Sequence, residues 1–399
     1  MKVILAYSGG LDTSASVIWL KRVKKFDQVV AVLVDVGQRD DFDALRERAL
    51  MLGADDVVVV DQKAAMCERG IAPMLKVGAT YEGSYLLGTA IARPFIADAM
   101  VEAALETGAG AICHGATGKG NDYLRFEQRI KVLAPGIQII SPWREWACGD
   151  REQALALIAD TGVSIPAKSF DYSIDANLWH TSYEGGSLED LSQAPPPFFR
   201  EEMHKEGVAE VQLVWEKGLP VALNGREMPL AEMIPTLNEL LAPTAYGWLD
   251  LLETRTNGLK SRGIYHTPAG TLLYEARTAL TQCWLAKPSL DFLADMGQTY
   301  GKFLYEGIWQ HPVQHAIEAA ADALFAEAQG TIDLVVKGAK AQVLARTASP
   351  NCFASELGGF GHMDSWNAAY SEALVFFQHL KYHSLPAGVA VHEPDLAAI

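Results

Sequence analysis

The residues best suited to bind a ligand lie near the start of the chain, where an apolar stretch over residues 3–6 runs into a turn. The turn reads Ser8-Gly9-Gly10-Leu11-Asp12-Thr13-Ser14. Paired glycines let the backbone bend sharply and approach a ligand with no Cβ in the way. A helix expected over 13–25 would direct unpaired N–H groups and its positive end at the same place, and the hydroxyls add donors. The turn therefore predicts a phosphate site; the alternative is an ordinary capped helix start.

The glycine spacing excludes the two commonest phosphate-binding motifs. No stretch supplies Gly, four residues and then Gly-Lys-Ser/Thr, as a P-loop requires. The Gly108-Ala109-Gly110 run lacks the third glycine of a dinucleotide-binding fingerprint. The turn at 8–14 is thus predicted to be a phosphate site of another kind.

Composition and charge narrow the class of protein. The 399 residues are too many for one ordinary core, so two domains are expected, and 49% hydrophobic residues are enough to fill them. A net charge of −16 argues against a nucleic-acid partner, since phosphate backbones are bound by clustered Lys and Arg. The five cysteines are dispersed, so neither a disulfide framework nor structural zinc is expected. With no apolar run of about 20 residues and no signal peptide before the first strand, we expect a cytoplasmic protein without membrane contacts.

The elements that position the turn alternate between strand and helix. Strands are predicted over 3–6, 29–36, 57–60, 110–114 and 137–140, and helices over 13–25, 41–52 and 90–107. This order indicates an α/β fold, a parallel sheet with helices on both faces, in which ligands bind beyond the carboxyl ends of the strands. We therefore expect the chemistry to follow Ala6, Val34 and Ile112.

Two further polar segments contribute donors and acceptors. One reads His114-Gly115-Ala116-Thr117-Gly118-Lys119-Gly120-Asn121-Asp122, with Arg125 three residues on. The other, residues 78–94, combines tyrosines with glycines and includes Tyr85. A solvated glycine-rich loop and simple packing of tyrosines are the alternatives for these two segments.

Together these segments resemble the argininosuccinate synthases, members of the N-type ATP pyrophosphatases, which cleave ATP to AMP and pyrophosphate. The resemblance rests on residues 6–14, on the Tyr-Glu-Gly-x-Tyr-x-Leu-Gly-Thr run at 81–89, and on residues 114–122 and 141–146. It continues through 172–179, 182–186 and 260–265, and so covers most of residues 1–290 in order.

The resemblance implies a ligand for each group of residues. ATP is expected along Ala6, Tyr7, Ser8, Gly9, Gly10, Leu11, Asp12, Thr13 and Ser14, with the adenine edge near Val34 and the nucleotide backing onto Gly115. Aspartate is expected at Thr117, Asn121 and Asp122. Citrulline is expected at Tyr85, Asn121, Arg125, Ser173, Ser182, Glu253 and Tyr265. The residue types suit these ligands, because Arg125 can hold a carboxylate with two parallel N–H bonds and Glu253 can accept from an ammonium or ureido N–H.

The chemistry implied by the resemblance is the ATP-dependent ligation of citrulline and aspartate into argininosuccinate, a step of arginine biosynthesis and of the urea cycle. The ureido oxygen would attack the α-phosphorus of ATP, and the amine of aspartate would then displace AMP from citrullyl-AMP. Alignment of the reactants alone can lower such a barrier by ~7–11 kcal/mol. Mg²⁺ is expected on the phosphates, with Asp12 or Asp122, the two catalytic candidates, as its carboxylate. His114 is either an acid-base group or a structural histidine.

Four positions depart from the residues usual in the family. Ala90 stands where Ser is usual, Val34 where Ala is usual, Thr254 where Asn is usual and His266 where Glu is usual. Lost hydrogen bonds are expected to weaken citrulline binding without abolishing function, since a neutral hydrogen bond contributes about 0.5–1.5 kcal/mol.

The second half of the chain does not continue the strand–helix alternation of the first half. Residues 185–199 read as a loop, hairpins are predicted over 211–223 and 331–346, helices over 229–241 and 271–285, and a strand over 248–253. This is an α+β domain, which the resemblance identifies as the synthetase and multimerisation domain of a homotetramer. An apolar stripe at 363–383 would pack on a neighbouring subunit or on its own domain. The predicted domains are 1–165, 166–360 and a helical tail, 361–399.

Three functions stay open on the sequence alone. The first is argininosuccinate synthesis. The second keeps the pyrophosphatase turn but transfers AMP to another amide or ureido acceptor, which Ala90 and Thr254 would allow. The third is a non-catalytic metabolite-binding protein, which the intact turn at 8–14 and residues 117–125 disfavour.

Overall fold

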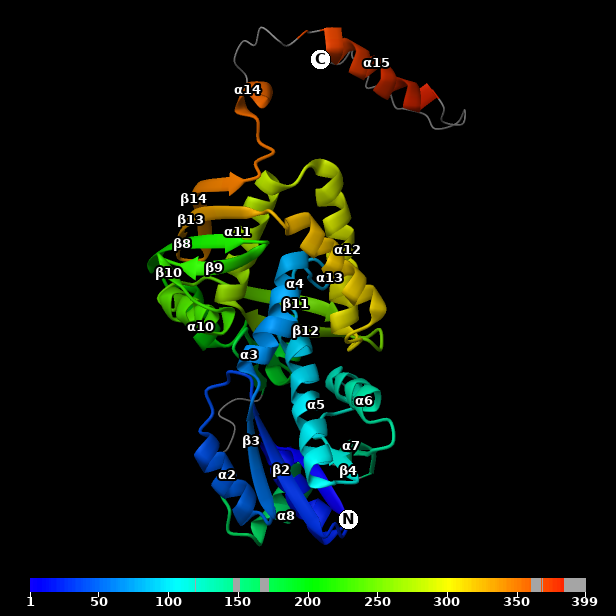
Figure 1. Ribbon diagram of the computed structural model, residues 1–399. Coiled ribbons are helices and arrows are strands. Elements are labelled where there is room, and N and C mark those ends of the chain that lie inside the picture. Colours follow the sequence, from blue (N-terminus) through cyan, green and yellow to red (C-terminus); the bar gives the residue numbers. More distant parts are fainter. Residues whose placement is uncertain (119, 146–150, 166–171, 360–366, 368, 384–399) are drawn as a thin grey trace. The chain divides into compact units, whose positions relative to one another are not determined.

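The computed structural model describes residues 1–118, 120–145, 151–165, 172–359, 367 and 369–383 (Figure 1). Lys119, the end of the 141–146 run and residues 363–366 of the predicted tail helix lie outside this described part. The chain forms two compact units, Met1–Cys352 and Phe353–Ile399.

The first half contains the predicted parallel sheet. Its strands are β1 (Lys2–Ala6), β2 (Gln28–Asp35), β3 (Asp56–Asp61), β4 (Ala111–Cys113) and β5 (Gln138–Ile140), in the order β3-β2-β1-β4-β5. All neighbours are parallel. The chain leaves β1 toward β2 on one side and returns to β4 on the other, so the order reverses between β1 and β4. Ligands of such sheets bind at this switch point.

Helices cover both faces of the sheet, as predicted. Val3 and Leu5 of β1 enter one core with α1 (Leu11–Arg22), α2 (Phe42–Met51) and α8 (Arg151–Ala159). Ile4 enters the opposite core with α5 (Gly88–Thr107) and α6 (Asp122–Leu133). The short α7 (Pro142–Glu145) follows β5.

The first helix differs from its predicted range of 13–25. It begins at Leu11, two residues earlier than predicted, with Gly10 as its N-cap residue. It ends at Arg22, and Lys25 has a φ of +59°, in the left-handed region, which a helix cannot continue through.

The second half contains two antiparallel sheets, which confirms its α+β character. The larger joins β10 (Arg226–Glu227), β9 (Leu219–Leu223), β8 (Val208–Glu216), β13 (Gln329–Lys337) and β14 (Lys340–Ser349) in this order. The smaller joins β11 (Trp248–Thr254), β12 (Lys260–His266), β7 (Thr181–Glu184) and β6 (Ser173–Ala176). Helices α10 (Leu230–Leu241), α11 (Pro268–Trp284), α12 (Lys287–Tyr305) and α13 (Pro312–Phe325) pack with these sheets.

The loop predicted over 185–199 is wrong at both ends. A 3₁₀ turn, η2 (Gly186–Glu189), follows β7, and α9 (Pro197–Met203) begins inside the proline run. Pro197 is tolerated at the first helical position because its missing N–H would have no partner there. Phe199 then buries itself in a small core with Tyr172 and Ile264.

The two halves share one continuous core. The segment between β3 and α5 forms α3 (Lys63–Met66), a π-helical turn (Cys67–Ile71) and α4 (Ala72–Val77), and α4 packs against α11, α12 and α13 of the second half (Figure 1). The approach is close, since a Cβ on Gly301 of α12 would lie 2.1 Å from the Thr80 carbonyl oxygen. The site residues of the two halves are therefore held in a fixed relation.

The second unit contains α14 (Ser355–Gly358) and α15 (Ala369–His383), so the predicted tail helix is confirmed over 369–383. The apolar side chains of α15 are exposed; they are Tyr370, Leu374, Val375, Phe376, Phe377 and Leu380. Within the described residues, no helix combines the length and apolar character needed to cross a bilayer.

Candidate active site

The turn after β1 has the form expected of a phosphate site. Gly9 has a φ of +72°, and a Cβ there would lie 2.1 Å from Leu45 Cδ2, so any larger residue would be strained at this position. Gly10 caps α1 without a side-chain hydrogen bond to the helix, which leaves the first backbone N–H groups uncapped by that residue. The Ser8 and Thr13 hydroxyls lie 3.2 Å apart beside them.

The turn after β4 lies beside this loop. A Cβ on Gly115 would stand 3.0 Å from Thr13 Cγ2, so the two loops adjoin at the switch point of the sheet. Val34, near the end of β2, is 8% exposed, and its carbonyl accepts a 2.8 Å hydrogen bond from Gln38 Nε2. Because Gly115 lies so close to Thr13, a larger side chain at position 115 would close the space between the two loops.

His114 has the contacts of a structural histidine. Its ring is buried, Nε2 lies 3.2 Å from Glu127 Oε1, and Nδ1 accepts a hydrogen bond from the Ala116 N–H. Because both nitrogens have protein partners, the structure favours the structural alternative over the acid-base one.

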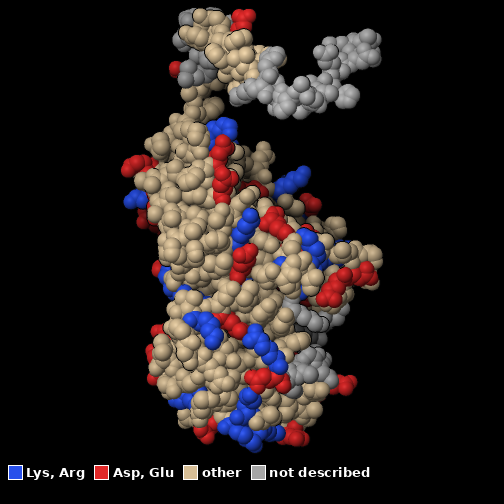
Figure 2. Space-filling view, turned by 90° about the vertical axis from the view of Figure 1, so that its right-hand side faces the viewer, with Lys and Arg blue, Asp and Glu red and all other residues tan. Residues whose placement is uncertain are grey.

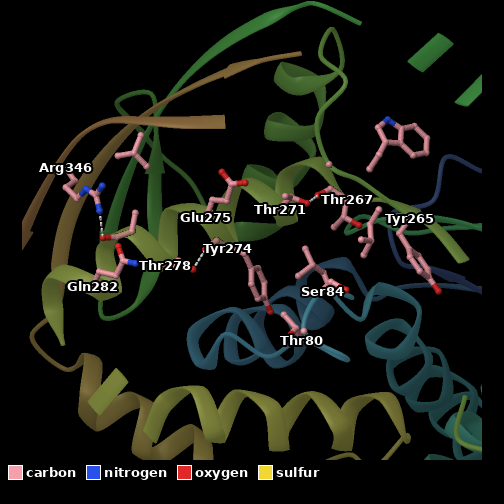
Figure 3. Close-up of a pocket in the computed structure, with 17 residues that line it drawn as sticks. Thr80, Ser84, Tyr265, Thr267, Thr271, Tyr274, Glu275, Thr278, Gln282 and Arg346 are labelled. Carbon is pink, nitrogen blue, oxygen red and sulfur yellow. Dashed lines mark hydrogen bonds between the residues drawn. The ribbon is translucent and has the colours of Figure 1, made fainter. Parts of the chain in front are cut away.

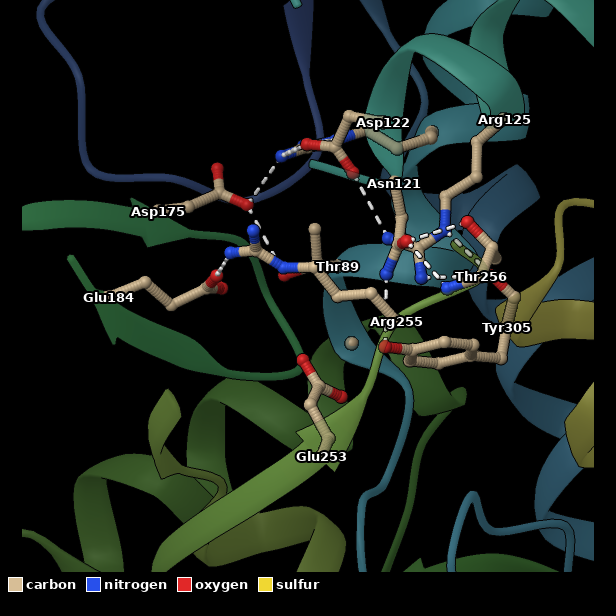
Figure 4. Close-up of polar contacts among 12 residues, drawn as sticks. Thr89, Asn121, Asp122, Arg125, Asp175, Glu184, Glu253, Arg255, Thr256 and Tyr305 are labelled. Atoms are coloured by element: carbon tan, nitrogen blue, oxygen red, sulfur yellow. Dashed lines mark hydrogen bonds and ion pairs between the residues drawn. The ribbon is translucent and has the colours of Figure 1, made fainter. Parts of the chain in front are cut away.

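A network of alternating charges lies at the start of α6 (Figure 4). Asp122 Oδ1 lies 3.0 Å from Arg125 Nη1, and Asp122 Oδ2 lies 2.8 Å from Arg93 Nη2. The same Arg93 nitrogen lies 2.7 Å from Asp175 Oδ2. Burial favours the neutral form of Asp122, but the two guanidinium groups outweigh it and lower the pKa of this carboxyl. Asp122 is therefore held ionised between two cations.

Arg125 is almost fully buried, and its three guanidinium nitrogens already donate hydrogen bonds within the protein. Nε and Nη2 donate to the carbonyl oxygen of Tyr305 at 3.0 and 2.9 Å, while Nη1 binds Asp122. A substrate carboxylate bound here would take the place of one of these partners or use the remaining Nη hydrogens.

One face of the smaller antiparallel sheet carries the predicted citrulline residues of the second half. Directly opposed residues in antiparallel strands share a face, and alternate residues along a strand do too. Ser182 opposes Asp175 on β6 and Tyr265 on β12, while Glu184 opposes Ser173 and Gly263. Glu253 opposes Ser261, two residues from Gly263. The following residues thus share one face: Ser173, Asp175, Ser182, Glu184, Glu253 and Tyr265.

Gly263 explains how Tyr265 reaches Glu253 along this face. A Cβ at position 263 would lie 2.3 Å from the Tyr265 hydroxyl, so the tyrosine lies over the glycine. Its hydroxyl donates a 2.9 Å hydrogen bond to Glu253 Oε1. The Tyr85 ring packs on the Tyr265 ring with centroids 4.5 Å apart. The first half of the chain thereby meets this sheet.

One carboxylate oxygen of Glu253 has a hydrogen-bond donor in the protein, and among the described residues the other has none. Burial raises the pKa of this carboxyl, although the Tyr265 hydroxyl and Arg125 act in the opposite direction. Among the described residues, its buried Oε2 finds no hydrogen-bond donor. An N–H group delivered by a substrate would satisfy this oxygen.

Asn121 joins the two halves from the other side. Its Nδ2 donates to the Tyr305 hydroxyl at 2.9 Å, and its Oδ1 accepts from the N–H and hydroxyl of Thr256 at 3.1 and 2.8 Å. The tip of the β11–β12 hairpin is thereby fixed to α6. From this tip, Arg255 extends toward Glu184, with Nη2 and Oε2 4.0 Å apart (Figure 4).

The structure brings together most of the predicted amino-acid-binding residues and adds others. Those brought together are Tyr85, Asn121, Asp122, Arg125, Ser182, Glu253 and Tyr265. Ser173 shares the sheet face of this network, although within the described residues no side-chain hydrogen bond joins Ser173 or Thr117 to it. Sequence reasoning did not single out Arg93, Asp175, Glu184, Arg255 and Tyr305.

The comparisons with known proteins show the family of both halves of the chain. Residues 2–164 match the family described as arginosuccinate synthase N-terminal HUP domain, and residues 172–385 match the arginosuccinate synthase C-terminal domain. The argininosuccinate synthase of Moorella thermoacetica is 42% identical over 343 residues, 84% of this chain and 83% of that protein. That of Caldicellulosiruptor saccharolyticus is 40% identical over 386 residues, 94% of each chain. The chain belongs to the argininosuccinate synthase family.

The departures from the usual argininosuccinate synthase residues fall in different places. Thr254 and His266 alternate with Glu253 and Tyr265, so their side chains point to the opposite face of the sheet. The Thr254 hydroxyl binds Lys260, and the His266 ring stacks on Trp248. These two departures therefore lie away from the site face, whereas Ala90 is buried one residue after Thr89, whose N–H donates to the Tyr85 hydroxyl.

A cavity of about 560 Å³ lies along α11 in this member of the argininosuccinate synthase family (Figure 3). Tyr265 lines one end and Arg346 the other. Much of its polar lining is engaged by backbone groups: Tyr274 donates to the Ala79 carbonyl at 2.6 Å, and Arg346 donates to the Ala279 carbonyl at 3.1 Å. The cavity does not contain the charged network.

Charge on the surface is mixed rather than segregated. Lys and Arg alternate with Asp and Glu over the face drawn in Figure 2. Among the described residues, no three His, Cys, Asp or Glu side chains are placed to hold a metal ion.

Proposed function

We propose that this protein condenses citrulline with aspartate at the expense of ATP, giving argininosuccinate, AMP and pyrophosphate through citrullyl-AMP. The family membership of both domains supports this reaction. So does the chemistry of the site, which offers a phosphate turn, buried guanidinium groups for carboxylates and a carboxylate oxygen for an N–H.

The residues act by binding and orienting the reactants. The turn at 8–14 would hold the ATP phosphates with backbone N–H groups and hydroxyls, beside Gly115. Glu253 and Tyr265 would hold the ureido group of citrulline, so that its oxygen faces the α-phosphorus. Asn121, Asp122 and Thr117 would hold aspartate. No protein nucleophile is needed, because the ureido oxygen itself attacks phosphorus and the aspartate amine then displaces AMP.

Of the two carboxylates considered for Mg²⁺, the geometry favours Asp12. Asp12 lies in the first turn of α1, directly next to the phosphate turn, whereas Asp122 lies at the start of α6 beside the guanidinium groups of Arg93 and Arg125. Mg²⁺ at nucleotides often uses one or two carboxylates together with the phosphates. The ion would neutralise phosphate charge.

The observation that carries the proposal is the convergence of distant segments on one polar network. Tyr85, Asn121 and Arg125 come from the nucleotide-binding half, and Ser182, Glu253 and Tyr265 come from the sheet of the second half. This convergence also disfavours a protein that keeps only the nucleotide turn.

The test is a product assay. Purified protein with Mg-ATP and citrulline, with and without aspartate, is expected to yield pyrophosphate, AMP and argininosuccinate, the last only when both amino acids are present. ATP binding without citrulline-dependent pyrophosphate would contradict the proposal and point to another acceptor or to a non-catalytic role.

Three further properties belong to the same proposal. A homotetramer built through the second half and the tail would cover the exposed apolar stripe of α15. We place the protein in the cytoplasm on the basis of its dispersed cysteines and its substrates. The functional division is proposed at 1–165, 166–360 and 361–399, whereas compactness alone divides the chain after Cys352.

A further inference from the structure

Glu184 is a carboxylate of the site that the roles above leave unused. It lies near the end of β7 on the same sheet face as Ser173, Ser182 and Tyr265. Its side chain is 33% exposed, and its nearest cation is Arg255, whose Nη2 lies 4.0 Å away. Figure 4 shows Glu184 across the network from Arg125, with Glu253 below it and Asp122 above it.

The surroundings of Glu184 are mostly negative. Glu253 on β11, Asp122 on α6 and Asp175 on β6 all face it, and Arg255 is the cation that opposes them. Burial first, and then these carboxylates, raise the pKa of Glu184 to about 7. Glu184 therefore lies between the residues assigned to aspartate and those assigned to citrulline, in a form that can take up a proton near neutral pH.

The other titratable groups of the network are poorly suited to accept a proton. Asp122 and Asp175 are paired with Arg93 at 2.8 and 2.7 Å. Glu253 is almost fully buried and accepts from the Tyr265 hydroxyl. Burial lowers the pKa of His180 to about 3, helped by Arg93 and Arg125, and its Nε2 lies 3.0 Å from the Thr89 hydroxyl.

The proposed reaction needs a proton acceptor at this place. The α-amine of aspartate is an ammonium ion near neutral pH and has no lone pair until a proton leaves. We propose that Glu184 accepts the proton that this ammonium loses before its nitrogen attacks the adenylated ureido carbon. This role rests on the proposed function and adds a catalytic residue to it.

Proton transfer precedes formation of the C–N bond. An N–H bond of the ammonium breaks and an O–H bond forms on Glu184, which leaves the lone pair on nitrogen. The lone pair forms the new C–N bond, and the C–O bond to AMP breaks with its electron pair on the phosphate oxygen. The surplus proton stays on the nitrogens of the product, which is a guanidinium cation, because guanidine nitrogens are far more basic than the AMP phosphate. Glu184 then returns its own proton to solvent.

The experiment separates the two half-reactions in Glu184→Gln. Citrulline-dependent pyrophosphate release without aspartate, measured in a single turnover, is expected to stay within about twofold of the unsubstituted protein. Argininosuccinate formation from the same intermediate is expected to fall roughly 10²- to 10⁴-fold, the usual contribution of general base catalysis. The exposed Glu189, on the turn after β7, supplies the control Glu189→Gln, in which both half-reactions are expected to be unchanged.

The pH dependence gives a readout that a structural role would not move. In the unsubstituted protein, argininosuccinate formation should fall as the pH drops below about 7, because the base becomes protonated. Glu184→Gln should lose the decline set near pH 7 and follow instead the ionisation of the substrate ammonium, whose pKa lies higher, while Glu184→Asp should keep a decline near pH 7 at a lower rate. Equal loss of both half-reactions, an unchanged rate or an unshifted decline near pH 7 in Glu184→Gln would overturn the proposal. If the unsubstituted protein makes no argininosuccinate, the proposed function fails instead.

Discussion

The Tyr305 hydroxyl accepts a 2.9 Å hydrogen bond from Asn121 Nδ2, although 184 positions of sequence separate the two residues. The carbonyl of the same tyrosine accepts from Arg125. One residue at the end of α12 thus holds two of the side chains assigned to the amino-acid substrates, and it does so without being assigned to either substrate.

Tyr305→Phe should therefore weaken substrate binding. It leaves Asn121 Nδ2 without its acceptor, which costs about 0.5–1.5 kcal/mol and corresponds to KM values for citrulline and aspartate roughly 2- to 10-fold higher. The KM for ATP should not change. Steady-state kinetics with each substrate varied in turn measure these KM values. Tyr300→Phe is the matched control, because Tyr300 lies on the same helix and donates to Glu318 instead. Equal effects of the two variants would assign the loss to helix packing.

Arg125→Ala is predicted to raise the citrulline requirement steeply and leave ATP binding nearly intact. It removes a buried cation and its bonds to charged groups, worth about 1.5–3 kcal/mol each, or about 10- to 100-fold in the KM for citrulline. Titration of citrulline at saturating ATP, beside a direct ATP-binding measurement, tests this. Arg226→Ala, at a side chain 72% exposed, is the control. An unchanged citrulline dependence would remove Arg125 from the site.

Gly9→Ala should weaken ATP binding by more than its loss of folding stability accounts for. A left-handed φ costs a non-glycine residue about 1–2 kcal/mol, and the new Cβ would also displace Leu45 at the base of the phosphate turn. Gly108→Ala has a similar φ of +66° but nothing within 4 Å of its Cβ. We expect both variants to lower Tm and only Gly9→Ala to raise the Kd for ATP. Equal ATP affinities in the two variants would contradict a role for the shape of the turn.

Glu184 should make stability depend on pH in a defined direction. Its pKa is raised to about 7 in the folded protein, so the folded state holds a proton that the unfolded state releases at lower pH. Stability from this group is present at low pH and is lost as the pH rises toward and through 7. Relative to the unsubstituted protein, Glu184→Gln should therefore gain more stability at pH 8 than at pH 5. Denaturant unfolding of both proteins at the two pH values measures their free energies of unfolding. An equal gain for Glu184→Gln at pH 5 and pH 8 would contradict the prediction.

Much of the fold follows from apolar periodicity. Long apolar runs such as that of β2 could be predicted because a strand buried on both faces needs little but β-branched and aliphatic residues. β6 and β7 were not predicted as strands, since each has four residues and polar side chains on the site face. The start of α9 at Pro197 was missed because a proline run also suits a loop.

The site was predicted only in part, for a physical reason. Asp175 and Glu184 lie two residues after Ser173 and Ser182, so the period of two along a strand could have placed them on the same face. Arg93 and Tyr305 carry no such signal, because each depends on partners from a different element. Their pairing with Asp122 and Asn121 arises only from tertiary packing.

The packing of α4 among α11, α12 and α13 means that a boundary drawn along the sequence is not a boundary for folding. A fragment ending at residue 165 would expose the apolar side of α4, including Met74 and Leu75, which the second half normally buries. A chimera between two relatives that exchanges only the nucleotide-binding half would have to match this buried surface as well as the substrates. The segment between β3 and α5 is therefore constrained by both halves at once, and its sequence should vary in concert with that of α11–α13.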